Sequence, residues 1–225
     1  MAVHPRSAAG ERVVYGIVSA RALRVHWALA ELELPYRTEP ILSRSGQTET
    51  AEYRRLNPRG KIPVLDDGGF ILTESPAIVT YLGSRYGRPD AQLVPCEPEA
   101  RARYDEWLSF VSMELDATSL YVIRRHEGLP QVYGEAPTAT RVAREYFVRQ
   151  IGAAASALED GRPHLLGDAF SGADILMATC LMWSDRLALP LPPAFADYMA
   201  RTSARPAFAR AIAANNRPGA APAAI

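Results

Sequence analysis

The hydrophobic pattern of this chain changes near Gly87, and this change limits the fold more than any other feature. Before Gly87, short apolar runs alternate with helical patterns. After it, nearly every segment up to Asn215 has the 3.6-residue periodicity of helices. A stretch with three prolines, GRPDAQLVPCEP, separates the two parts. We therefore expect an α/β domain over residues 13–87, followed by an all-helical domain over residues 97–217.

The first part alternates strands and helices. Strands are expected at residues 13–18, 36–42, 62–65 and 70–72, and helices at residues 22–34 and 49–56. The sequence Asp66-Asp67-Gly68-Gly69 predicts a tight hairpin, because glycine tolerates the positive φ of such turns. Ser75-Pro76 is expected to open a third helix with Ser75 as its N-cap, and Gly87 to end that helix in the left-handed conformation.

The helix expected at residues 22–34 has two apolar stripes. Leu23 and Trp27 belong to one stripe, and Val25 and Leu29 belong to the other. A helix with two apolar stripes must be covered on two sides. We expect one stripe to pack on the sheet of its own domain and the other on the helical domain.

Composition and charge exclude several classes of function. Lysine plus arginine equals aspartate plus glutamate, so no net charge favours nucleic acid or an anionic membrane. No run approaches the roughly 18 to 20 apolar residues of a membrane span, and the first residues lack the apolar core of a signal peptide. The two cysteines are far apart without a CxxC pair, and the four histidines lack metal-ligand spacing. We expect a cytoplasmic protein without a metal, a nucleic-acid partner or a membrane partner.

Two patterns in the helical part concern folding and assembly. Ser171 and Asp174 resemble a capping box, with Phe170 and Ile175 as its hydrophobic staple. A polar stripe on a long helix, expected to face solvent, consists of Asp105, Ser109, Ser112, Asp116 and Ser119. The tail RPGAAPAAI is expected to be disordered.

Three motifs of the first part form a recognisable series. Ser19 lies at a strand-to-helix junction, residues 57–65 read NPRGKIPVL, and Glu74-Ser75 precedes a helix. At this spacing, and ahead of a helical second half, the chain resembles the cytosolic glutathione transferases, from about Val13 to Asn215. The resemblance implies a thioredoxin-like first domain, glutathione as co-substrate and a homodimer. In the homodimer, the polar stripe would line the cleft between subunits.

The resemblance also implies how glutathione binds. Its cysteinyl unit would pair with the main chain of Ile62, exposed by a cis bond to Pro63; the alternative is that Pro63 only begins or borders a strand. Glu74 and Ser75 would bind the γ-glutamyl end, although the pair also fits a plain helix start. Some relatives bind the glycine carboxylate through a histidine that this chain lacks. The matching residue here is Thr48, and Thr48, Arg44 or Lys61 would replace it.

Ser19 matches the serine that some classes of the family use to activate the thiol. A hydroxyl that donates to a thiolate stabilises the charged form. The alternative is an N-cap or turn serine. Tyr15 and Arg21 are the alternative activators of the thiol. If they have no such role, Tyr15 is a half-buried strand residue and Arg21 is a surface residue. No cysteine lies between Val13 and Leu34, so glutathionylation chemistry at a catalytic cysteine is not expected.

The resemblance implies an enzyme that conjugates glutathione to small electrophiles, with peroxide reduction at the same site. The alternative is a non-catalytic glutathione-binding or interaction module. Candidates to line an electrophile pocket, or else to fill the core, are Tyr15, Arg21, Met113, Tyr121 and Arg124.

Overall fold

The structure is a computed structural model of the 225-residue chain, and it describes residues 10–216. Contacts divide these residues into two units. The first unit contains residues 10–93 together with 204–216, and the second contains residues 94–203. The tail expected to be disordered, residues 217–225, lies outside the described residues.

The first unit is an α/β unit with a four-stranded sheet. Its elements are β1 (Arg12–Tyr15), α1 (Ala20–Glu31), β2 (Arg37–Glu39), the 3₁₀ turn η1 (Gln47–Glu49), α2 (Ala51–Leu56), β3 (Val64–Asp67), β4 (Phe70–Thr73), α3 (Ser75–Tyr86) and α10 (Pro206–Asn215). The strand order is β2-β1-β3-β4, with β1 parallel to β2 and antiparallel to β3. The predicted hairpin joins β3 to β4, and both Gly68 and Gly69 have positive φ, at 63° and 100°.

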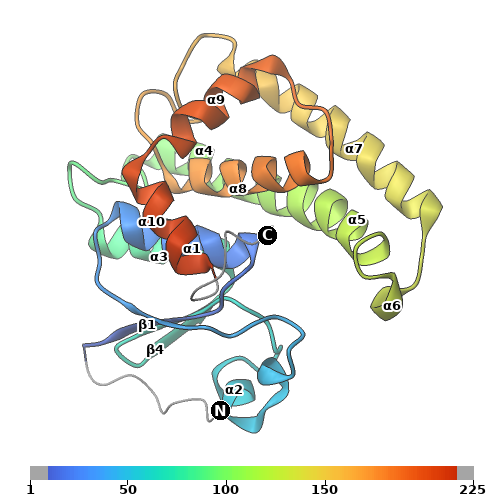
Figure 1. Cartoon of the computed structure of the whole chain (residues 1–225). Helices are drawn as coiled ribbons and strands as arrows, with labels where there is room; N and C mark the ends of the chain where they lie inside the picture. Colours follow the sequence, from blue (N-terminus) through green and yellow to red (C-terminus); the bar gives the residue numbers. More distant parts are fainter. Residues whose placement is uncertain (1–9, 217–225) are drawn as a thin grey trace. The chain divides into compact units, whose positions relative to one another are not determined.

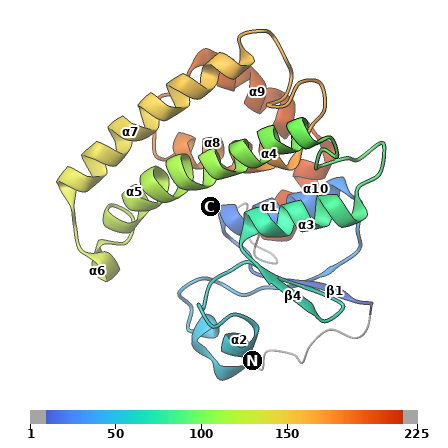
Figure 2. The same cartoon turned by 180° about the vertical axis from the view of Figure 1, so that it is seen from behind.

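Helices cover both faces of this sheet. Figures 1 and 2 show α1, α3 and α10 on one side and α2 on the other. Because side chains alternate along a strand, Val13 and Tyr15 of β1 point to the same face. They pack there with Val64 of β3 and with Tyr53 of α2 in a buried cluster.

The helix α1 is covered on two sides, as its two stripes predict, and six of its apolar residues are fully buried. The sequence predicted that the second apolar stripe of this helix would pack on the helical domain. In the structure, the Trp27 ring contacts Phe208 of α10, with their centroids 4.7 Å apart. The helix α10 therefore belongs to the first unit, although in the sequence it follows directly after the second unit.

Two predictions about the ends of α3 were wrong. The helix begins at Ser75, so the N-cap is Glu74, and no side-chain cap bond is formed within the described residues. Gly87 has a φ of −58° and is not left-handed. Glycine is nevertheless required there, because a Cβ at Gly87 would lie 2.4 Å from the carbonyl oxygen of Gly83.

The second unit is helical. Its elements are α4 (Pro98–Phe110), the π-helix η2 (Val111–Leu120), α5 (Tyr121–His126), α6 (Pro130–Tyr133), α7 (Pro137–Ala155), the 3₁₀ turn η3 (Ser156–Leu158), α8 (Gly172–Arg186) and α9 (Pro193–Ser203). Segments α4, η2 and α5 follow one another without a break, and α7 and α8 both pack on η2. Most residues of α8 are buried. The predicted capping box of Ser171 and Asp174 opens this helix.

No helix in residues 10–216 combines the length and the apolar character that crossing a membrane requires.

Candidate functional site

Ser19 is the N-cap residue of α1. Its backbone is extended, with φ −149° and ψ 136°, and its carbonyl accepts the N–H of Leu23 at 2.9 Å. The side chain is half-buried, and within residues 10–216 its hydroxyl does not cap the helix. Ser19 therefore occupies the N-cap position, as the alternative interpretation expects, but its side chain makes no capping hydrogen bond to the described part of the chain. The hydroxyl remains available beside the positive end of the helix dipole.

The loop between β1 and Ser19 is fixed by hydrogen bonds from several elements. The N–H of Gly16 donates to the carbonyl of Glu39 at 3.0 Å, and the N–H of Ile17 donates to the carbonyl of Ile41 at 3.0 Å. The carbonyl of Gly16 is 3.0 Å from Nε2 of His26. Because a carbonyl only accepts, Nε2 carries the proton, and Nδ1 accepts from the Tyr36 hydroxyl at 2.9 Å.

This loop contacts the Ile62–Pro63 segment. Gly16 has a φ of 133°, and a Cβ built on it would lie 2.8 Å from Cβ of Ile62. Only glycine permits this approach without displacement. The fold therefore brings the loop before Ser19 into contact with Ile62, although the two are far apart in the sequence.

The Ile62–Pro63 bond is cis, as the resemblance predicted. Just before it, the carbonyl of Lys61 accepts from the Tyr53 hydroxyl at 2.7 Å and from Nδ2 of Asn57 at 2.8 Å. Within the described residues, neither the N–H nor the C=O of Ile62 takes part in a hydrogen bond. Its main chain is therefore available to an extended peptide, while the preceding residue is held in place.

Glu74 and Ser75 lie at the start of α3. Glu74 has a φ of 68°, and its carboxylate is 3.1 Å from Nη1 of Arg59, with both side chains largely exposed. Ser75 is 3% exposed, and its Oγ accepts from Nη1 of Arg24 at 3.3 Å. The start of α3 thus offers a carboxylate next to the free N–H groups of a helix end.

Sequence reasoning missed Arg24. The helical period places Arg24 between the two apolar stripes of α1 and indicates no partner, yet Arg24 is 1% exposed and its guanidinium donates to Ser75. A buried guanidinium below the start of α3 adds positive charge where an anion would bind. The signal in the sequence was an arginine flanked by apolar residues in a helix covered on two sides.

The residues proposed for the glycine end of glutathione differ in accessibility. Lys61 is exposed. Thr48 is only 2% exposed, and its hydroxyl donates to the Glu49 carboxylate at 3.4 Å. Arg44 is exposed and has a φ of 60°. Of the three, Thr48 is the least accessible to a ligand.

Tyr15 belongs to the core of the first unit. It is 0% exposed, and its hydroxyl has no hydrogen-bond partner among the described residues. Burial raises the pKa of its phenol above the ordinary value. This placement agrees with the plain interpretation of a strand tyrosine and makes Tyr15 a poor donor to a bound thiol.

The other proposed pocket residues belong to two units. Arg21 is the second residue of α1 and is half-buried. Met113 lies in η2 with 59% exposure, while Tyr121 and Arg124 lie in α5. The guanidinium of Arg125 stacks on the Tyr121 ring at 4.6 Å.

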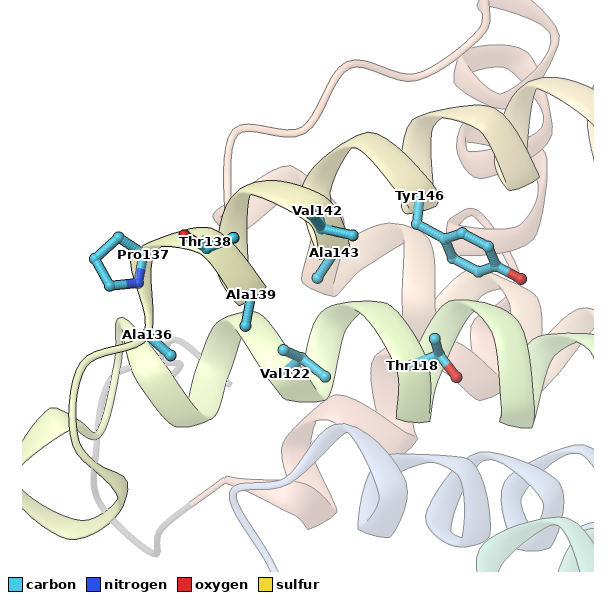
Figure 3. A pocket seen from close by; sticks show the side chains of 9 residues that line it. All are labelled: Thr118, Val122, Ala136, Pro137, Thr138, Ala139, Val142, Ala143 and Tyr146. Carbon is cyan, nitrogen blue, oxygen red and sulfur yellow. The ribbon is translucent and has the colours of Figure 1, made fainter.

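The second unit also contains an open apolar groove of about 650 Å³ (Figure 3). Thr118 and Val122 line one side, and residues of α7 that include Ala139, Val142 and Tyr146 line the other. None of the residues proposed for the electrophile pocket lines this groove. In residues 10–216, no three histidine, cysteine, aspartate or glutamate side chains are grouped so that they could hold a metal ion.

Comparisons with known proteins agree with this arrangement. Residues 18–85 match the family model "Glutathione S-transferase, N-terminal domain", and residues 110–206 match "Glutathione S-transferase, C-terminal domain". Together the two segments cover more than half of the chain. Glutathione S-transferase theta-1 of Bos taurus is 32% identical over 153 residues, which are 66% of this chain and 62% of the bovine protein. The match thus spans less than two thirds of that relative.

Two solved structures share the fold over nearly their whole length. The theta class glutathione S-transferase from Xanthomonas axonopodis pv. citri, solved with glutathione bound, is 25% identical with a TM-score of 0.78. The match covers 90% of this chain and 97% of that one. A glutathione transferase from Methylococcus capsulatus is 29% identical with a TM-score of 0.78, over 91% of this chain and 98% of that one. The chain therefore belongs to the cytosolic glutathione transferase family.

Proposed function

We propose that this protein is a glutathione transferase that conjugates the glutathione thiolate to small electrophiles. The observation that carries the proposal is the position of Ser19 at the N-terminus of α1, after a loop that contacts Ile62, with a hydroxyl that caps no backbone N–H within residues 10–216. The theta class relatives and the structure with glutathione bound support the choice of co-substrate.

The main chain of Ile62 pairs with the cysteinyl unit, because its N–H and C=O form no hydrogen bond within residues 10–216. Glu74 accepts from the ammonium group of the γ-glutamyl end of glutathione. The carboxylate of the same γ-glutamyl end binds to the first N–H groups of α3. Lys61, assisted by Arg44 or Thr48, binds the glycine carboxylate. Lys61 is favoured over Thr48 because its side chain is exposed.

Ser19 then donates to the thiolate. A free thiol has a pKa of about 8.5, and each unit of lowering needs about 1.4 kcal/mol. A hydrogen bond to a charged group contributes about 1.5 to 3 kcal/mol, and a helix N-terminus adds about 0.3 to 1 kcal/mol. Together these terms lower the pKa of the bound thiol to about 7 or below, where much of it is ionised at neutral pH.

The reaction needs no covalent enzyme intermediate. With a chloronitrobenzene as acceptor, the thiolate sulfur forms a bond to the ring carbon, the carbon–chlorine bond breaks and chloride leaves. The thiol proton goes to solvent. The protein contributes thiol ionisation and proximity of the two reactants.

Steady-state kinetics with such an acceptor test this function. Ser19→Ala is expected to lower kcat/KM by about 10- to 100-fold, the equivalent of one charge-assisted hydrogen bond. Ser203→Ala is the matched control, because Ser203 is an exposed serine of α9 whose hydroxyl donates to carbonyls of its own helix. Glutathione binding without turnover across a panel of chemically different electrophiles would support the non-catalytic module instead.

Finer features of the proposal follow from the family. The enzyme acts in the cytoplasm as a homodimer that detoxifies electrophiles, with peroxide reduction at the same site as a secondary activity. An exposed aromatic contact between Phe70 and Tyr81, with centroids 5.0 Å apart, offers apolar surface for a subunit contact. Size-exclusion chromatography with light scattering would show twice the chain's 24.6 kDa if the dimer forms.

A further inference from the structure

Val18, the residue before Ser19, has an unusual backbone conformation. Its φ is 54°, in the left-handed region that β-branched residues avoid. Such a conformation persists only where the surroundings enforce it, and it is found most often at functional sites.

The left-handed turn is held from the far end of the chain. The N–H of Val18 donates to the main-chain carbonyl of Asn215 at 2.7 Å. Asn215 is the last residue of α10. A short hydrogen bond to the end of α10 therefore fixes the Ile17–Val18 peptide group, one residue before the proposed catalytic serine.

The helix α10 is itself fixed to α1. Arg205 forms two bonds of 2.7 Å to the Glu31 carboxylate, and Arg210 donates to the Ala30 carbonyl at 2.9 Å. The Trp27 and Phe208 rings are in contact. Both ends of α1 are thus connected to α10: its C-terminal end through Glu31 and its N-terminal loop through Asn215.

The side chain of Asn215 is costly where it lies. It is 0% exposed, and neither Nδ2 nor Oδ1 has a hydrogen-bond partner among residues 10–216. A buried amide without partners destabilises the folded state, and an apolar residue of the same shape would not. Packing alone therefore does not explain an asparagine at this position.

We propose that Asn215 is a positioning residue of the glutathione site. Its main-chain carbonyl holds Val18 in the left-handed turn, and its carboxamide hydrogen-bonds the Val18–Ser19 loop once the Ser19 hydroxyl has turned to the thiolate. This inference rests on the proposed function, because Asn215 acts through Ser19 and does not touch the thiol.

The test compares two adjacent asparagines. Asn215→Leu keeps the main-chain carbonyl and removes only the buried carboxamide. Asn216→Leu is the matched control, because Asn216 is partly exposed and its backbone N–H donates to the Ala213 carbonyl at the helix end. Both variants are measured for thermal unfolding, for kcat and KM with glutathione, and for the pH dependence of kcat.

Asn215→Leu is expected to unfold at the wild-type temperature or above. Its KM for glutathione stays within about twofold, while kcat at neutral pH falls about tenfold and the pH profile moves up by about one unit. Asn215→Ser, which retains a hydrogen-bonding group, recovers part of the loss. If Asn215→Leu is more stable and its kcat and pH profile are unchanged, Asn215 is a packing residue and the proposal fails.

Hydrogen exchange in the ligand-free protein tests the main-chain bond without any activity. The Val18 amide is expected to be protected in the wild type, and Phe208→Ala is expected to speed its exchange at least about tenfold more than that of the Leu65 amide in β3. A Val18 amide that exchanges freely in the wild type would overturn the inference. If glutathione does not bind or its thiol pKa is not lowered in the wild type, the proposed function fails, and the exchange result still decides whether α10 fixes the loop.

Discussion

At the scale of single residues, the loop before Ser19 depends on side chains that the sequence did not reveal. The helical period places His26 and Arg24 between the apolar stripes of α1, a position that indicates no particular partner. In the structure, His26 donates to the Gly16 carbonyl and Arg24 donates to Ser75, so both lie below the proposed glutathione site. Helical periodicity gives the face on which a residue lies, but not the partner that it meets across the core.

His26 should make stability depend on pH. Burial lowers the pKa of His26 to about 4, below the ordinary value of 6.5. Above about pH 6.5 the imidazole is neutral in both states and has no effect. As the pH falls, the unfolded chain binds the proton first, so the free energy of unfolding decreases between about pH 6.5 and pH 4, by about 3 kcal/mol in total.

Urea unfolding of the wild type and of His26→Gln, at pH 7 and pH 5, measures this term. Carboxylates affect both proteins equally, so the difference between them isolates His26. The variant should lose less stability than the wild type when the pH is lowered. Equal losses in the two proteins would show that His26 is not buried in its neutral form.

At the scale of elements, the sequence predicted the features that depend on neighbouring residues. It did not predict how side chains lie after the α-helix α4 continues as a π-helix. The hairpin at Gly68-Gly69 and the capping box of α8 formed as predicted, because each depends on neighbouring residues alone. The polar stripe did not remain on one solvated face. Asp105 and Ser109 are exposed, whereas Asp116 and Ser119 are buried. Residues 111–120 form a π-helix, whose wider turn rotates later residues out of a stripe spaced at 3.6.

The capping box of α8 should be worth more than a helix cap. Asp174 is 0% exposed and accepts from the N–H groups of Ser171 and Leu165, and also from the Tyr198 hydroxyl at 2.8 Å. Asp174→Ala leaves several buried donors without a partner, and we expect it to lower the free energy of unfolding by about 3 to 5 kcal/mol. Denaturant titration measures this loss. Asp168→Ala, at an exposed aspartate in the preceding loop, should change stability by less than about 0.5 kcal/mol; similar effects of the two changes would contradict the account.

At the scale of the whole molecule, the sequence predicted two parts but not where the last helix belongs. The expected helical domain ran to residue 217, whereas contacts group residues 204–216 with the α/β unit. The apolar face of α10 has the same periodicity as its neighbours. Pattern alone shows that this face is buried, and only the structure shows that it packs on Trp27.

The α/β unit should therefore need α10 in order to fold. Residues 1–93 alone would leave the Trp27 side of α1 uncovered, and we expect no cooperative thermal transition by circular dichroism. The same residues joined by a flexible glycine-serine linker to residues 204–216 should unfold cooperatively. A cooperative transition in residues 1–93 alone would show that α10 is dispensable for this unit.

The central claim is that Ser19 activates the thiol of bound glutathione, and the thiol itself reports this most directly. The absorbance of the glutathione thiolate, followed against pH on the purified protein, gives the apparent pKa of the bound thiol. We predict a pKa at least about one unit below that of the free thiol in the wild type, and a return toward the free value of about 8.5 in Ser19→Ala. If the wild type and Ser19→Ala bind glutathione with the same thiol pKa, Ser19 is not the activator and the account of this site is contradicted.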